Sequence, residues 1–134
     1  MTGFALVQDA DANDEVRAVF DEMRTLRRTD YVNDIWRALA NHPPTLRRTW
    51  DQVKSVMGEP GPLDPLTREL IYIAVSVVNS CDYCIGTHTA SARAKGATDE
   101  MLGQLLGIVA TATLTNRLAL GYGVELDERY RSPA

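Results

Sequence analysis

The chain has 134 residues, of which 45% are hydrophobic and 24% are charged, and its formal net charge is −4. This length suits a single domain with a real core, and the composition is typical of a soluble globular protein. Acidic and basic residues are interleaved, so we expect no basic surface that binds nucleic acid. The chain starts without the basic residues and long apolar run of a secretory signal, which favours a cytoplasmic location.

Helical periodicity dominates the first part of the chain. Both ends are polar, and we expect residues 1–12 and 127–134 to be loose. After Asn13, a suitable N-cap, apolar residues recur at spacings of three and four, which predicts a helix. A second, shorter helical pattern covers residues 31–41 and ends before two prolines. Pro44 can open a third helix, because proline is favoured in the first turn.

The run from residue 66 to residue 79 is apolar on most of its sides. Asp64 before Pro65 is typical of a helix start, with an N-cap followed by a first-turn proline. Its β-branched residues make a buried strand the competing interpretation, which would indicate a thioredoxin-like domain. The length of the run, its start and the lack of other strand patterns favour a helix. Its polar positions follow at helical spacing: Glu69, Tyr72, Ser76 and Asn79.

The remaining elements are also expected to be helices. Asn79-Ser80 predicts a tight turn and a cap before a helix over residues 81–95, which ends in basic residues and Gly96. Two further helices are expected, over residues 98–109 and 114–122. Polar residues interrupt this apolar stretch, so it favours buried helices over a membrane span.

The predicted architecture is therefore all-α: one compact domain over residues 1–134, with six or seven helices and an antiparallel helix pair that carries the site. Several of the helices are apolar on more than one face. We expect other copies of the chain to bury part of this surface.

The chemically distinctive stretch contains Cys81, Cys84 and His88. On a helix, side chains turn by about 100° per residue, so these three fall within an arc of roughly 60°. The free N–H groups of the first helical turn favour a thiolate, and an imidazole one turn beyond Cys84 can take its proton. Zinc bound by the three residues, with Glu69 as a fourth ligand, and a purely structural cysteine pair are the alternatives.

Glu69 is the acid that a helical hairpin brings to this stretch. If the two helices fold back at Asn79-Ser80, Glu69 and His88 lie at similar distances from the turn and become neighbours. The hypothesis is a relay in which Glu69 orients His88, His88 deprotonates Cys84 and Cys81 resolves the oxidised sulfur. A salt bridge between Glu69 and an arginine is the structural alternative. Four further residues are candidates for lining the pocket: Tyr72, Ser76, Tyr83 and Asn116.

Glu69, eleven intervening residues, Cys81-x-x-Cys84 and then His88 closely resemble the core of the AhpD-like alkylhydroperoxidase group within the carboxymuconolactone decarboxylase superfamily. The resemblance extends to residues 31–43, 68–70 and 116–119. It implies an AhpD-like all-helical fold, assembly into trimers or hexamers, and peroxide reduction by a dithiol/disulfide cycle. By analogy, Cys84 is the peroxidatic cysteine and Cys81 its disulfide partner.

The sequence thus predicts a thiol-dependent peroxidase that reduces hydrogen peroxide or organic hydroperoxides without a metal or cofactor. A thiol or lipoyl-type compound is the expected electron donor, although Tyr83 stands where the founding alkylhydroperoxidase has a histidine. A carboxymuconolactone decarboxylase-like lactone enzyme, whose site does not depend on the cysteine pair, is one alternative. A non-catalytic redox or zinc-binding module is the other.

Overall fold

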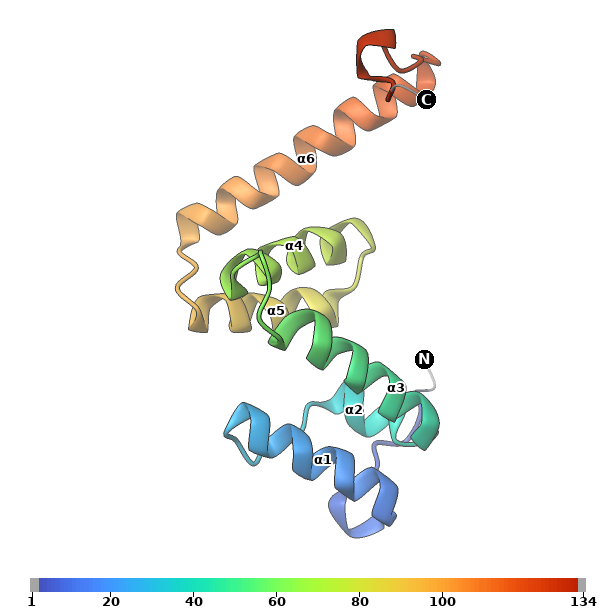
Figure 1. The fold of residues 1–134 in the computed structure, drawn as a ribbon, viewed down its shortest axis with the longest axis vertical. Helices are drawn as coiled ribbons and strands as arrows, with labels where there is room; N and C mark the ends of the chain where they lie inside the picture. Colours follow the sequence, from blue (N-terminus) through green and yellow to red (C-terminus); the bar gives the residue numbers. More distant parts are fainter. Residues whose placement is uncertain (1–2, 133–134) are drawn as a thin grey trace. The chain divides into compact units, whose positions relative to one another are not determined.

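The computed structural model describes residues 3–132, and the regular elements of this part of the chain are all helical, which confirms the predicted all-α class (Figure 1). The α-helices are α1 (Asp14–Arg27), α2 (Asp34–Leu39), α3 (Pro43–Val53), α4 (Pro65–Val78), α5 (Asp82–Ala94) and α6 (Asp99–Gly121). Three short elements accompany them: the 3-10 turns η1 (Asp9–Asp11) and η3 (Glu128–Tyr130), and the π-helical turn η2 (Lys54–Gly58).

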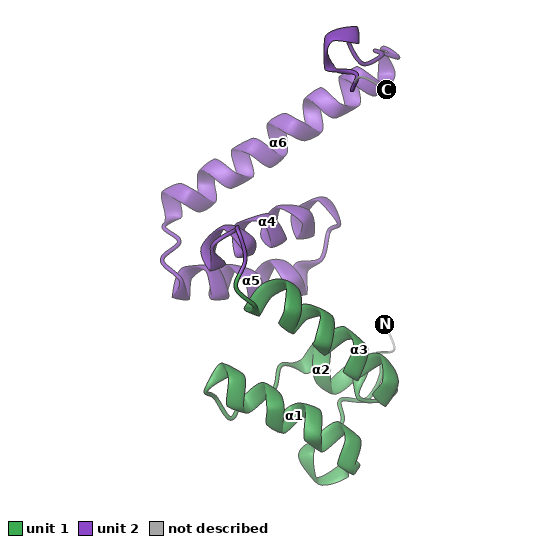
Figure 2. Cartoon of the chain, in the orientation of Figure 1, with its two compact units in different colours: residues 1–60 green, residues 61–134 purple. Residues whose placement is uncertain are grey.

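The chain divides into two compact units, unit 1 (Met1–Pro60) and unit 2 (Gly61–Ala134) (Figure 2). Unit 1 contains α1, α2 and α3, whereas unit 2 contains α4, α5 and α6. The expectation of one domain over residues 1–134 stays a prediction. The cysteines, His88 and Glu69 all belong to unit 2.

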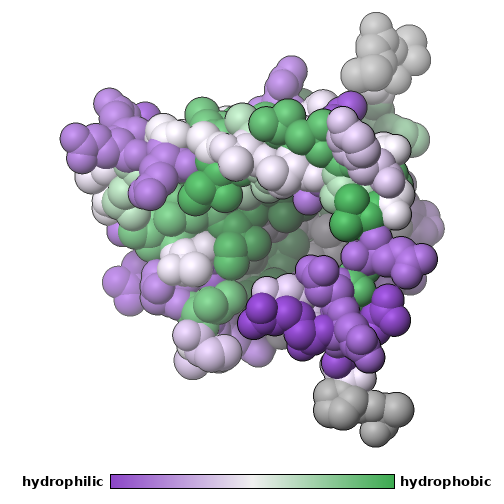
Figure 3. Space-filling view, turned by 90° about the horizontal axis from the view of Figure 1, so that it is seen from above, coloured by the Kyte–Doolittle hydropathy of each residue, from purple (hydrophilic) through white to green (hydrophobic). Residues whose placement is uncertain are grey.

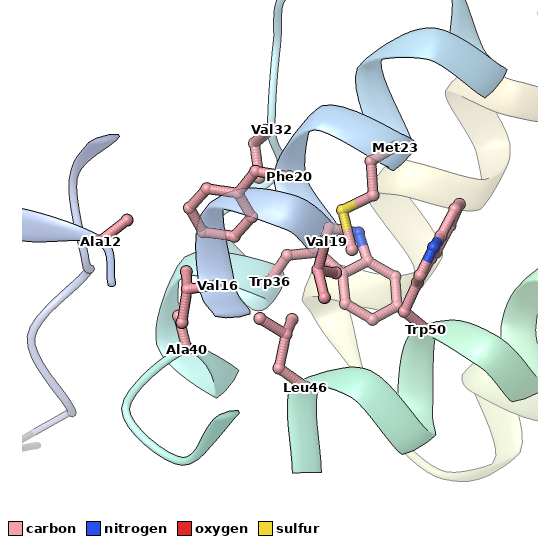
Figure 4. Packing of buried hydrophobic residues seen from close by; sticks show 10 residues of the cluster. All are labelled: Ala12, Val16, Val19, Phe20, Met23, Val32, Trp36, Ala40, Leu46 and Trp50. Carbon is pink, nitrogen blue, oxygen red and sulfur yellow. The ribbon is translucent and has the colours of Figure 1, made fainter. Parts of the chain in front are cut away.

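Unit 1 has the larger apolar core (Figure 4). Trp36 and Trp50 meet edge to face with ring centroids 5.7 Å apart, and the Arg27 guanidinium lies near both rings. Both tryptophans are buried, so they act as packing residues of this core. The buried cluster comprises Ala12, Val16, Val19, Phe20, Met23, Val32, Trp36, Ala40, Leu46 and Trp50.

The helix starts in unit 1 follow the predicted caps closely. The Asn13 side chain accepts a hydrogen bond from the Val16 N–H and caps α1, as predicted. Helix α2 begins after Asn33 and is shorter than the predicted 31–41, because Val32 is buried in extended chain that precedes the helix. Helix α3 begins at Pro43, one residue before the predicted start.

The segment before α1 makes contacts with unit 1, and the expectation that residues 1–12 and 127–134 are loose stays a prediction. The Asp9 carboxylate bridges Arg24 (2.6 Å) and Arg37 (3.0 Å), and the Val7 N–H donates to the Arg37 carbonyl (3.1 Å). Charge pairing with α1 and α2 was not visible in the local pattern of this segment. Residues 1–2 and 133–134, the outer parts of the predicted loose ends, lie outside the described residues.

The α4–α5 hairpin confirms the predicted helix pair and corrects its turn. Asp64 caps α4 by accepting from the Thr67 N–H, and Pro65 opens it, so the helix interpretation was right and the strand alternative wrong. Ser80 has a φ of 57°, and Cys81 rather than Ser80 is the N-cap of α5. A left-handed residue reverses the chain but does not have the extended backbone of an N-cap, so the cap moves one residue on.

Helix α6 replaces the two helices predicted over residues 98–109 and 114–122. Residues 110–113 contain neither proline nor glycine, so nothing interrupts helical geometry. The Thr113 hydroxyl donates to the Val109 carbonyl (2.7 Å), which satisfies this polar group within the helix. Thr98 caps the helix by accepting a hydrogen bond from the Met101 N–H.

Helices α4 and α6 expose many large apolar side chains. The space-filling view shows hydrophobic residues exposed on one face of the molecule (Figure 3). None of the residues of α6 is buried, although α6 packs on α4. Among the described residues, no helix is both long and apolar enough to cross a membrane. The exposed apolar side chains on α4 and α6 are Ile71, Val75, Val78, Leu106, Ile108, Leu114, Leu118 and Leu120.

The core of unit 1 gives a direct stability prediction. Leu46 is fully buried, whereas Leu26 on α1 is 56% exposed. Leu46→Ala should lower the free energy of unfolding by about 2–5 kcal/mol, because it leaves a cavity, whereas Leu26→Ala should cost less than about 1 kcal/mol. Urea unfolding followed by far-UV circular dichroism measures both. Equal losses for the two variants would contradict the packing described.

Candidate active site

The antiparallel pair α4–α5 positions the candidate site in unit 2. Small residues let the two helices approach closely, since Ala92 on α5 is fully buried against Ile73 of α4. The short turn at Asn79-Ser80 sets the register of the pair. The Cys81 N–H donates to the Ser76 carbonyl (3.0 Å), which fixes the start of α5 on the end of α4. With this register, Glu69 and His88 meet as the sequence predicted.

Glu69 is a buried carboxylate with an exposed fraction of only 6%. Its Oε2 contacts His88 Nδ1 at 2.7 Å, and its Oε1 accepts from the Ser91 hydroxyl at 2.8 Å and from Lys95 Nζ at 3.1 Å. Burial alone would raise the pKa of this carboxyl, but the hydrogen bonds from His88, Ser91 and Lys95 outweigh it and lower the pKa to about 2. Glu69 is therefore ionised at neutral pH, and the arginine salt bridge considered for it is replaced by Lys95 and His88.

The imidazole of His88 is held from two sides. An ionised Glu69 can only accept a hydrogen bond, so it selects the tautomer of the neutral imidazole that has its proton on Nδ1 and its lone pair on Nε2. The Tyr72 ring stacks on the imidazole, with centroids 3.6 Å apart and planes 20° apart. Tyr72 follows Glu69 by one helical turn on α4, so both residues face α5 together. The ring of His88 therefore has a fixed orientation and a fixed tautomer.

Cys81 and Cys84 form a disulfide at the start of α5. The Cys84 N–H donates to Cys81 Sγ at 3.3 Å, so the sulfur of Cys81 takes the place of a capping oxygen. The free N–H groups at this helix end favour negative charge on sulfur when the pair is reduced. His88 follows Cys84 by one turn of the same helix.

The other predicted residues occupy three different environments. Ser76 is buried and donates to the Tyr72 carbonyl at 2.7 Å, so its hydroxyl is satisfied within α4. Tyr83 is 42% exposed and stands directly before Cys84 in the sequence. Asn116 is an exposed residue of α6. Among these pocket candidates, Tyr72 stacks directly on the His88 ring.

Ser91 and Lys95 are site residues that the sequence reasoning missed. Ser91 lies on α5 and Lys95 is the C-cap of this helix, so the two follow His88 at one-turn steps on one face. That spacing was a usable signal once Glu69 had been placed beside His88. Within residues 3–132, no group of three or more His, Cys, Asp or Glu side chains is arranged to hold a metal ion.

The fold and site together define an all-helical protein with an alkylhydroperoxidase-like arrangement of a cysteine pair, a histidine and a buried carboxylate. The chain belongs to the carboxymuconolactone decarboxylase family, whose model matches residues 44–128. Within it the chain is AhpD-like: the crystal structure of an alkylhydroperoxidase AhpD core from Rhodospirillum rubrum is 50% identical, with a TM-score of 0.93 over 97% of each chain.

Two curated relatives match shorter stretches. The alkyl hydroperoxide reductase AhpD of Mycobacteroides abscessus is 39% identical over 56 residues, which is 42% of this chain and 31% of that protein. A Paracoccus denitrificans protein described as uncharacterized protein 4 in the cox locus is 40% identical over 50 residues, which is 37% of this chain and 45% of that protein. The matches thus span less than half of either relative.

The low pKa of Glu69 predicts how stability depends on pH. The pKa falls from its usual 4.5 to about 2 in the folded protein. The stabilisation is therefore complete above pH 4.5 and is lost as pH falls towards 2; it amounts to at most roughly 3 kcal/mol. Glu69→Gln should flatten the stability profile in this range, and chemical unfolding at a series of pH values measures it. Glu125→Gln, at an exposed position, should retain the wild-type slope; an unchanged slope in Glu69→Gln would contradict the assignment.

Proposed function

We propose that the protein is a thiol-dependent peroxidase that reduces hydrogen peroxide or organic hydroperoxides through the Cys81–Cys84 pair. The observation that carries the proposal is the contact of the buried, ionised Glu69 with His88, one helical turn from Cys84. The AhpD names of two similar proteins give the reaction class by analogy. Unit 2 carries all four proposed reacting residues: Glu69, Cys81, Cys84 and His88.

In the proposed cycle, His88 Nε2 takes the proton of the Cys84 thiol, and the thiolate attacks one peroxide oxygen. The O–O bond breaks, and the leaving alkoxide or hydroxide takes the proton from His88. Cys84 is then a sulfenic acid. The Cys81 thiol attacks that sulfur, a disulfide forms and water leaves. The protein gives up two electrons in each cycle.

A dithiol donor closes the cycle by thiol–disulfide exchange, which reduces Cys81 and Cys84 and oxidises the donor. A thiol or lipoyl-type compound supplies this chemistry. A reducing compartment maintains such donors, so we propose the cytoplasm as the site of action. No metal or other cofactor takes part in the proposed steps.

The name of the matching family favours a second candidate, a lactone decarboxylase-like reaction. In that case Glu69 and His88 would move protons on a carbon substrate. Turnover would then be indifferent to replacement of either cysteine, whereas the peroxidase requires Cys84.

We also propose that the chain assembles with copies of itself, as a trimer or a hexamer. Unit 2 buries only three apolar residues in its own core, whereas α6 leaves a series of leucines and an isoleucine exposed. Burial of apolar surface stabilises association by roughly 25 cal/mol per Å². Leu114 and Leu118, one turn apart on α6, lie on one side of the helix and suit such an interface.

Peroxide consumption tests the proposed activity. With dithiothreitol, dihydrolipoamide or glutathione as reductant, Cys84→Ser should abolish turnover; without reductant, Cys81→Ser should stop at the Cys84 sulfenic acid. His88→Ala should slow turnover by roughly a hundredfold or more, because a general base is lost. His42→Ala is the matched control, since the chain has only two histidines. Undiminished peroxide turnover in Cys84→Ser would exclude the mechanism.

Sedimentation velocity tests the assembly. The wild type should sediment as a trimer or hexamer, and Leu114→Glu together with Leu118→Glu should shift it to smaller species, because buried carboxylates oppose association. Arg48→Glu, at an exposed position of unit 1, controls for an added negative charge. A monomeric wild type at micromolar concentration would rule out the proposal.

A further inference from the structure

Glu69 divides its two oxygens between different tasks. Oε2 contacts His88 Nδ1, whereas Oε1 accepts from Ser91 Oγ and from Lys95 Nζ. Lys95 Nζ also donates to Ser91 Oγ at 2.7 Å, so Oε1, Ser91 Oγ and Lys95 Nζ form a closed triangle of hydrogen bonds. Oε1 therefore accepts two hydrogen bonds, whereas Oε2 contacts His88.

This arrangement matters because the carboxylate is buried. The Glu69 side chain is 8% exposed, and an ionised carboxylate at such a position is costly unless a cation and hydrogen-bond donors compensate for the lost water. Lys95 has a side chain that is 37% exposed, so its ammonium retains water while it reaches the carboxylate. Lys95 therefore supplies positive charge to Glu69 without burial of a second full charge.

The triangle also determines which way the carboxylate turns. A carboxylate on a three-carbon side chain can rotate about its last bond, and each rotation changes the oxygen that faces the imidazole. Ser91 Oγ is 2.8 Å from Oε1. Ser91 lies on α5, one turn after His88 and one turn before the C-cap residue Lys95. Two donors on Oε1 hold the plane of the carboxylate, so Oε2 stays aligned with Nδ1.

We propose that Lys95 and Ser91 are positioning residues of the proton relay, which keep Glu69 ionised and turned with Oε2 on His88. They act through Glu69 and touch neither the cysteines nor the peroxide. Loss of either donor lets the carboxylate rotate, and His88 then loses the fixed tautomer that leaves Nε2 free to take the proton of Cys84. The inference rests on the proposed function for its consequence in turnover, but its structural core concerns the Glu69–His88 hydrogen bond alone.

Other charged groups near this pair have different partners. Arg68, next to Glu69 on α4, donates from Nε to the Leu63 carbonyl at 2.8 Å. Arg93 on α5 pairs with Asp99 of α6 at 2.7 Å. Arg93 is thus a basic residue of the same helix that faces another acid, which makes it the matched control for Lys95.

Proton NMR in water reads the hydrogen bond directly. A histidine Nδ1 proton held by a buried carboxylate exchanges slowly and gives a low-field signal, which disappears in Glu69→Gln and remains in His42→Gln. Lys95→Met should broaden or abolish this signal, Ser91→Ala should weaken it, and Lys95→Arg should restore it. Arg93→Met should leave it unchanged. Circular dichroism verifies that each variant is folded, and Lys95→Gln replaces Lys95→Met if the latter is not.

Peroxide turnover supplies the second readout. Lys95→Met should lower kcat by roughly tenfold with little change in KM, because a misplaced base affects the reaction more than binding. In a Glu69→Gln background, Lys95→Met should have no further effect, since Lys95 acts through Glu69. A signal and turnover that survive in both Lys95→Met and Ser91→Ala would overturn the proposal, as would additive losses in the double variant.

The two readouts separate this proposal from the proposed function. A low-field signal that depends on Lys95 in a protein without peroxide turnover supports the positioning role and excludes the peroxidase. Peroxide turnover together with a signal that does not depend on Lys95 or Ser91 supports the peroxidase and excludes the positioning role.

Discussion

The structure of unit 2 depends on the burial of one carboxylate. Glu69 projects from α4, and its three short contacts come from His88 and Ser91 of α5 and from Lys95, the C-cap of that helix. The apolar core of the same unit is small, with Ile73, Ala92 and Ala97 as its buried residues. Because this core is small, the hydrogen bonds of Glu69 contribute strongly to fixing the register of α4 against α5. A slip of one residue would leave the carboxylate buried and unpaired, at a cost of several kcal/mol.

Comparison with unit 1 shows what is particular about this carboxylate. Glu22 is also ionised with a pKa lowered to about 2, chiefly by the hydrogen bond from Lys54, and it is held as well by Arg47 and the Trp50 indole. Its donors are an ammonium, a guanidinium and an indole, which keep their protons near neutral pH. Glu69 replaces one such donor with an imidazole. Both carboxylates are thus kept ionised by hydrogen-bond donors. In the proposed function, only Glu69 takes part in proton transfer, because its partner His88 has an imidazole.

The sequence predicted those features that local chemistry determines. The caps at Asn13 and Asp64 were predicted correctly, because each is set by a side chain three residues before the N–H whose hydrogen bond it accepts. The Glu69–His88 contact was predictable as well, since a short turn between two helices fixes their register by simple counting. Ser91 and Lys95 were missed because serine and lysine are common on exposed helix faces. Only a known partner on α4 distinguishes them from ordinary surface residues.

The cysteine pair raises the question of how a redox cycle and a fixed base can share one helix. Cys81 is both the N-cap of α5 and one half of the disulfide, and its sulfur accepts the Cys84 N–H. A cap made by sulfur needs no proton on that sulfur, so it is available to a thiolate as well as to a disulfide. Because the turn at Ser80 and the Cys81 N–H bond to Ser76 anchor the backbone independently of the sulfur, the start of α5 can keep its place in both states. His88, one turn further along, is attached to Glu69 rather than to the cysteines. The proposed chemistry can therefore change the bonds at the end of α5 while the base stays where it is.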